Sequence, residues 1–160
     1  MTAVFVVSFI SPAAADAASR TATDRFCARA HVQNIGWMFT VCSDGANIFV
    51  GTTGASLRME ALSLSMSGSR FCAQAHVQNI GWQDERCAEA GGQITVGTTG
   101  QSLRMEALVL RADDRTICAI AYVQNIGWQN QQCAVPGGHA AEVGTVGQSL
   151  RMEALNLWSY

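Results

Sequence analysis

The chain contains no lysine, and only 14% of its 160 residues are charged. Its ten basic residues are therefore all arginine, and twelve acidic residues give a formal net charge of −2. The absence of lysine excludes Schiff-base catalysis and the phosphate-binding P-loop. A protein that binds nucleic acid or an anionic membrane surface carries a basic patch, which this charge balance does not supply. We therefore expect no nucleic-acid partner.

The apolar run near the N-terminus is also short. Val4–Ile10 has seven residues, whereas a bilayer-spanning helix needs about 20, so we expect no membrane insertion. Pro12 and Ala15–Ala17 follow, and the latter fits an A-x-A cleavage site. These features predict a signal peptide remnant at 1–17 and a mature chain from about Ala18, although no basic segment precedes the run. A disordered apolar tail is the alternative.

The six cysteines form no C-x-x-C motif. They fall into three pairs with equal internal spacing: Cys27 and Cys42, Cys72 and Cys87, Cys118 and Cys133. One bridge within each pair is the simplest connectivity, and each would stabilise the fold by about 3 kcal/mol. Zinc binding is the alternative, but it needs clustered Cys and His ligands. We therefore predict three disulfides, no metal, no cofactor and a secreted protein.

Two motifs occur three times along the chain. VQNIGW occupies Val32–Trp37, Val77–Trp82 and Val123–Trp128, and SLRMEAL follows each of these segments. Matching residues are about 45 positions apart, a period typical of tandem structural repeats. We predict one domain, 18–160, made of three repeats at 25–66, 70–112 and 115–158.

The hydrophobic pattern inside a repeat has period two. Within Phe71–Gln78, Phe71, Ala73 and Ala75 fall on one face and the residues between them on the other, as in a half-buried strand. LRMEALVL begins in the same way, but Leu108 and Leu110 break the alternation, which predicts a β-bulge or burial of both faces. Its residues also favour helix, but the flanking segments leave room for only about two turns, so a strand is preferred.

Three or four short strands in each of three repeats predict an all-β domain. A unit of about 45 residues is too small to bury an adequate core alone. Three repeats that close around a pseudo-threefold axis share one core and also remove exposed strand edges. A β-trefoil and a three-sided β-prism both meet these requirements, and the repeat length and short strands favour the trefoil.

Four polar residues recur with the tryptophan of each repeat. A monosaccharide needs an apolar platform such as Trp, together with amide, carboxylate and guanidinium groups for its hydroxyls. We therefore predict one monosaccharide pocket per repeat. The predicted residues are Gln33, Asn34, Trp37, Arg58 and Glu60; Gln78, Asn79, Trp82, Arg104 and Glu106; and Gln124, Asn125, Trp128, Arg151 and Glu153.

A ring residue on the same strand face as the Gln is also predicted to line each sugar site: His31, His76 and, in repeat three, Tyr122. Because Tyr replaces His, this position cannot be a required proton carrier. Each repeat also keeps only one carboxylate, whereas a glycosidase uses two. We therefore expect no catalytic residues and no enzyme. The alternative is structural: Asn satisfies a turn, Arg and Glu link neighbouring repeats, and Trp is core. The protein would then be a secreted structural or adhesive module that binds protein.

The letters HVQNIGWQ and GTTGQSLRMEAL resemble the clostridial hydrophobic W repeat over all three repeats, from Phe26 to Leu157. As a free-standing triple repeat, the chain is also similar to small secreted actinobacterial haemagglutinins that recognise L-rhamnose and D-galactose. The resemblance implies a multivalent bacterial lectin that cross-links cell-surface or cell-wall glycans. It adds Gln83 and Gln129 to the sites. Repeat one has Met38 where Gln83 and Gln129 stand, and Ala55 where Gln101 and Gln148 stand, so it is expected to bind weakly or only to support the fold.

Overall fold

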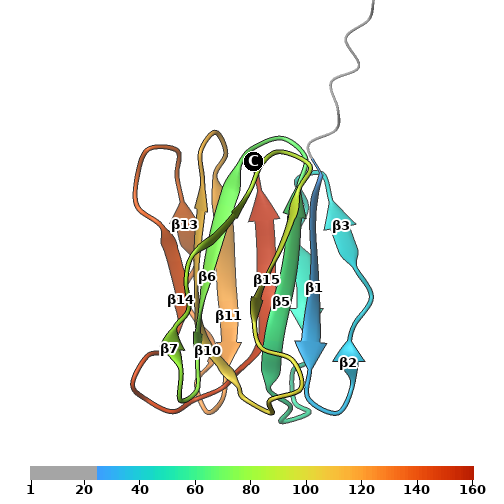
Figure 1. Cartoon of the computed structure of the whole chain (residues 1–160), viewed down its shortest axis with the longest axis vertical. Helices are drawn as coiled ribbons and strands as arrows, with labels where there is room; N and C mark the ends of the chain where they lie inside the picture. The colour runs from blue at the N-terminus through green and yellow to red at the C-terminus, as the bar shows by residue number, and fades with distance from the viewer. Residues whose placement is uncertain (1–24) are drawn as a thin grey trace, which may run out of the picture.

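The computed structural model describes residues 25–160, which form fifteen β-strands and no helix (Figure 1). The predicted all-β fold of three repeats is therefore confirmed. Among these residues there is consequently no helix that could span a membrane. The predicted signal peptide at 1–17 and the start near Ala18 lie outside the described residues.

Each repeat contributes five strands, one or two more than the three or four predicted, and the strand lengths follow the same order in every repeat. Repeat one forms β1 (Phe26–Val32), β2 (Gly36–Trp37), β3 (Val41–Ser43), β4 (Ile48–Gly51) and β5 (Met59–Met66). Repeat two forms β6 (Phe71–Val77), β7 (Gly81–Trp82), β8 (Arg86–Ala88), β9 (Gln93–Gly97) and β10 (Met105–Ala112). Repeat three forms β11 (Ile117–Val123), β12 (Gly127–Trp128), β13 (Gln132–Ala134), β14 (Ala141–Gly144) and β15 (Met152–Ser159). SLRMEAL thus enters a strand in every repeat, as predicted.

The strands form three antiparallel sheets of five, and each sheet takes one strand from another repeat. The first joins β1, β2, β3 and β5 to β9 of repeat two. The second joins β6, β7, β8 and β10 to β14 of repeat three, and the third joins β11, β12, β13 and β15 to β4 of repeat one. No repeat therefore completes its sheet alone. Within residues 25–160 no sheet closes into a barrel, and the choice between β-trefoil and β-prism stays a prediction.

The inner faces of the three sheets share one hydrophobic core. Equivalent positions carry similar side chains: Phe26, Phe71 and Ile117 begin the first long strand of each repeat, and Met59, Met105 and Met152 begin the second. The second long strand lies in the middle of its sheet, and in β10 seven of eight residues are buried, including Leu108 and Leu110. The predicted burial of both strand faces is therefore confirmed.

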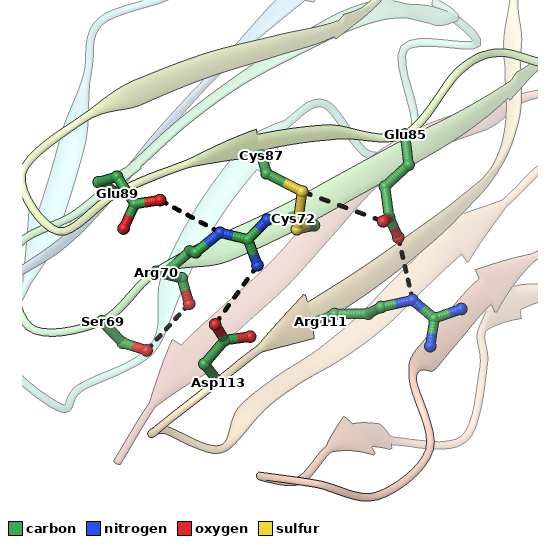
Figure 2. Close-up of a disulfide and its surroundings, with 8 residues drawn as sticks. All are labelled: Ser69, Arg70, Cys72, Glu85, Cys87, Glu89, Arg111 and Asp113. Atoms are coloured by element: carbon green, nitrogen blue, oxygen red, sulfur yellow. Dashed lines mark hydrogen bonds and ion pairs between the residues drawn. A yellow bond between two sulfur atoms is a disulfide. The ribbon is translucent and has the colours of Figure 1, made fainter.

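Three disulfides join the first long strand of each repeat to its third strand, at Cys27–Cys42, Cys72–Cys87 and Cys118–Cys133. The predicted pairing is confirmed. Figure 2 shows the second bridge, where Arg70 contacts Glu89 at 3.2 Å and Asp113 at 3.3 Å. Glu85 approaches the Cys87 sulfur, but a bridged sulfur is not the thiolate that a metal requires. The bridged strands β3 and β13 lie towards the upper end of the molecule, and β2 and β7 towards the lower end (Figure 1).

Candidate functional site

The Gln-Asn pair of VQNIGW lies in a tight turn at the end of the first long strand. In repeat two the Ile80 N–H donates to the Val77 carbonyl oxygen at 3.1 Å. Asn79, inside this turn, has a φ of 63°, a left-handed conformation that Asn tolerates better than most residues. The Gln78 N–H donates to the Arg104 carbonyl oxygen at 3.0 Å and so links the two motifs. The turn accounts for the repeated Asn, while sugar contacts of the Gln and Asn side chains stay predictions.

The same turn recurs in the other two repeats. Asn34 and Asn125 each have a φ of 64°, and Gln33 and Gln124 donate their N–H groups to the carbonyl oxygens of the Arg residues in SLRMEAL. All three Asn side chains are exposed.

Each tryptophan follows this turn and packs against the ring residue opposite it. Trp82 is the register partner of His76, and their ring centroids lie 5.2 Å apart in an edge-on arrangement. The equivalent pairs are Trp37 with His31 and Trp128 with Tyr122, both at 5.3 Å. The three tryptophans remain 37%, 38% and 45% exposed in chain order. Each is therefore an oriented aromatic surface that solvent reaches.

The second motif places a carboxylate and a guanidinium beside each ring pair. In repeat two, Glu106 Oε1 accepts from Arg104 Nε at 2.9 Å and contacts Nη2 at 2.7 Å. Its Oε2 lies 3.1 Å from His76 Nδ1, a close contact that is not aligned as a hydrogen bond. The Glu106 side chain is only 7% exposed and the Arg104 side chain 19%. The carboxylate thus connects the guanidinium to the imidazole that supports Trp82.

Repeat one reproduces this arrangement, and repeat three keeps the ion pair between Arg and Glu but has Tyr122 in place of the histidine. Glu60 binds Arg58 at 2.8 Å and lies 3.1 Å from His31, and Glu153 binds Arg151 at 2.7 Å. We call these sets the Trp clusters. They consist of Trp37, His31, Glu60 and Arg58; Trp82, His76, Glu106 and Arg104; and Trp128, Tyr122, Glu153 and Arg151. The structure therefore brings four of the predicted residue positions together in every repeat.

The glutamate of each cluster is the extra residue of a β-bulge. Met105 pairs with Val77 and Ala107 pairs with His76, which leaves Glu106 without a register partner. The bulge thus lies just before the break in alternation that Leu108 marks. The same shift occurs at Glu60 and Glu153. A bulge re-aims a side chain, and here it is the carboxylate of the cluster.

Each bulge is supported by a residue pair from another repeat: repeat two supports the bulge of repeat one, repeat three that of repeat two, and repeat one that of repeat three. The Thr145 N–H, from repeat three, donates to the Glu106 carbonyl oxygen at 2.8 Å. Gly144, just before it, has a φ of 97°, and a Cβ there would lie 2.3 Å from the same oxygen, so only glycine fits. Gly97 with Thr98 supports Glu60 in the same way, and Gly51 with Thr52 supports Glu153. Strand exchange between repeats therefore helps to position every cluster.

Gln83 and Gln129 follow their tryptophans and hold the supporting glycines. The Gly97 N–H donates to Gln83 Oε1 at 2.7 Å, and Gln83 Nε2 donates to the Gly97 carbonyl oxygen at 3.2 Å. Gln129 makes the same two bonds to Gly144, at 2.7 and 3.0 Å. In repeat one the equivalent residue is Met38, which has no amide and packs against the core. The amides therefore have a structural partner, and their sugar contact stays a prediction.

The surroundings of the three tryptophans differ in ways that the sequence did not reveal. The Arg29 guanidinium lies 4.7 Å from the Trp37 ring centroid, within the range of a cation–π contact. Phe49, from repeat one, lies 6.2 Å from Trp128 of repeat three. Neither residue recurs at the matching position of the other repeats, so the repeated motifs gave no signal for them.

The clostridial hydrophobic W family model matches the chain three times, at residues 31–68, 76–111 and 122–158. Each match contains one complete Trp cluster. No curated protein and no solved structure matches the chain. Because the three matches cover more than half of the 160 residues, the chain belongs to the clostridial hydrophobic W family.

Proposed function

We propose that this protein is a multivalent carbohydrate-binding protein with one monosaccharide site at the Trp cluster of each repeat. The observation that carries the proposal is the cluster itself, in which a partly exposed Trp stands beside a second ring, a carboxylate and a guanidinium. The C–H face of a sugar packs on such a ring, and its hydroxyls bind planar polar groups. Each cluster holds one carboxylate, where a glycosidase uses two, so the proposal is binding without catalysis.

The resemblance to rhamnose- and galactose-binding haemagglutinins supports L-rhamnose and D-galactose as ligands. Linked sites raise overall avidity by about 10²–10⁴ over a single site when the geometry permits, and cross-linking of cell-surface or cell-wall glycans would follow. Three disulfides in a small all-β domain are consistent with an extracellular location. Repeat one has Arg29 over its tryptophan and lacks the glutamine, so its site is expected to be the weakest.

Tryptophan fluorescence tests the proposal directly. Wild type and the Trp82→Ala/Trp128→Ala double variant would be titrated with L-rhamnose, D-galactose and D-mannose. We expect a saturable change with rhamnose or galactose that is lost in the double variant, whose fold is checked by circular dichroism. Trp158 lies outside the clusters, and Trp158→Phe serves as the matched control that keeps the response. A flat titration of folded wild type with every sugar would overturn the proposal.

One observation favours a second candidate, an adhesive module that binds protein. Repeat one exposes three large apolar side chains close together in the sequence: Ile35 (51%), Phe39 (95%) and Val41 (40%). Exposed apolar groups of this kind occur at protein-binding surfaces. Agglutination of red cells separates the two candidates, because free sugar abolishes lectin-driven agglutination and leaves protein-driven agglutination unchanged.

A further inference from the structure

Repeat three has a polar groove beside its tryptophan that the repeated motifs do not account for. The groove has a volume of about 490 Å³ and is lined chiefly by Trp128, Gln129, Asn130, Gln132, Glu142 and Gly144. We call it the repeat-three groove. Asn130, Gln132 and Glu142 were not among the predicted site residues, because each differs from its counterparts in repeats one and two.

Strands from two different sheets form the walls of this groove. β12 and β13 pair with β11 in the third sheet, whereas β14 pairs with β10 in the second sheet. The Gln129 amide ties the two walls together through its two hydrogen bonds to Gly144. Trp128 is itself oriented by Tyr122 and Phe49 and stays 45% exposed. The groove is therefore a preformed concave surface next to an accessible ring.

The polar side chains that line the groove are available to a ligand. Within residues 25–160, the side chains of Asn130, Gln132 and Glu142 form no hydrogen bond or ion pair, and all three residues are exposed. Glu142 is the one charged residue in the lining. Two amides and a carboxylate beside an aromatic ring accept and donate hydrogen bonds to sugar hydroxyls. The same carboxylate attracts a protonated amine and repels an acidic sugar.

The three matching positions differ in chemical character from repeat to repeat. They hold Phe39, Val41 and Phe49 in repeat one, and Asp84, Arg86 and Thr95 in repeat two. At these three positions repeat one holds only apolar residues, repeat two carries both signs of charge, and repeat three has two amides and one carboxylate. Repeat one also has Arg29 over Trp37, and its Phe49 contacts Trp128 of repeat three. The repeats keep the same Trp cluster but differ in the groups that would meet the rest of a ligand.

We propose that the repeat-three groove is a saccharide site that accepts neutral and amino sugars and disfavours uronic acids, and that Glu142 sets this selectivity. The inference rests on the proposed carbohydrate-binding function and adds to it a ligand class and a selectivity-determining residue. Because the Glu142 carboxylate is exposed, its contribution is that of a solvent-screened charge. We expect D-galactosamine to bind about three- to fivefold more tightly than D-galacturonate.

The indole N–H resonance of Trp128 in a ¹H–¹⁵N correlation spectrum reports on this groove separately from the other repeats. D-galactose, D-galactosamine and D-galacturonate would each be titrated at pH 6, where the amine is protonated and the uronate is ionised. In wild type we expect galactosamine to bind Trp128 at least as tightly as galactose, and galacturonate to bind least. In Glu142→Gln the preference for amine over carboxylate should disappear while galactose binding persists.

Asp84→Asn is the matched control, since it removes one exposed carboxylate from repeat two and changes the net charge equally. It should leave the ranking at Trp128 unchanged. If Glu142→Gln keeps the wild-type ranking while sugars still shift Trp128, the role of Glu142 is wrong and carbohydrate binding stands. If no sugar shifts any cluster tryptophan of the folded wild type, the proposed function falls together with this inference.

Discussion

Replacement of Gln83 by Met is the clearest test of how the repeats hold each other in place. The substitution copies the residue that repeat one already has at Met38. It removes both side-chain hydrogen bonds to Gly97, at 2.7 and 3.2 Å, while it keeps a side chain of similar length. Gly97 in turn lies against the Glu60 bulge of repeat one. The loss should therefore weaken the contact between repeats one and two.

The expected magnitude follows from the number and exposure of the bonds. A hydrogen bond between neutral groups contributes about 0.5–1.5 kcal/mol net, so the pair is worth about 1–3 kcal/mol. Gly97 is only partly buried, so water partly satisfies the groups that lose their partner. We therefore expect Gln83→Met to lower the free energy of unfolding by about 1–2 kcal/mol. Gln83→Glu should also be destabilising, because a carboxylate still accepts from the Gly97 N–H but cannot donate to the Gly97 carbonyl oxygen.

Urea denaturation followed by circular dichroism measures the change, with an unchanged m-value as evidence that the same transition is observed. The melting temperature should fall by about 2–4 °C per kcal/mol in a domain of this size. Gln101→Met is the matched control, since Gln101 is exposed. A Gln83→Met protein as stable as the Gln101→Met protein would refute the reasoning.

Three further predictions, one of them with a control variant, test other parts of the fold. Gly97→Ala should lower the free energy of unfolding, measured by urea denaturation, by about 2–5 kcal/mol, because its Cβ would lie 2.4 Å from the Glu60 carbonyl oxygen and φ is positive. Its control, Gly100→Ala, also has a positive φ but has open space around the added Cβ, so it should lower the free energy of unfolding by only about 1–2 kcal/mol. Glu106→Gln should lower the free energy of unfolding by about 1–3 kcal/mol. This is less than the loss expected on breaking a fully buried ion pair, because the side chain of its partner Arg104 is 19% exposed. An unchanged free energy of unfolding would contradict the assigned ion pair. The double substitution Cys72→Ser/Cys87→Ser removes a disulfide between residues 15 positions apart. It should lower the free energy of unfolding, measured by thermal denaturation under oxidising conditions, by about 3 kcal/mol.

The sequence predicted those features that are local or repeated. Equal spacing indicated the pairing of Cys72 with Cys87, and the two-residue period indicated the strand that begins at Phe71. The recurrence of Trp, Arg and Glu indicated groups that the structure brings into one cluster per repeat. Each of these features either depends on residues that are close together in the sequence or recurs in all three repeats.

Strand exchange between repeats left no such signal. The segment Gln93–Gly97 alternates in the same way whether it joins its own sheet or that of repeat one, so its hydrophobic pattern cannot select the partner. The bulge at Glu106 lies just before the break in alternation and places Leu108 and Leu110 in the core together with Met105. The central location of β10 buries its other face as well, and the alternation alone could not show that both effects occur. For Gln83, the sequence did not reveal that the amide holds Gly97.

The most direct test of carbohydrate binding at the Trp clusters is an ¹H–¹⁵N spectrum of the four indole N–H groups during titration with L-rhamnose and D-galactose. Sugar binding predicts saturable shifts of Trp82 and Trp128, smaller shifts of Trp37, and none of Trp158, which lies outside the clusters. Unchanged resonances for Trp37, Trp82 and Trp128 with both sugars, in protein that is folded, would contradict it.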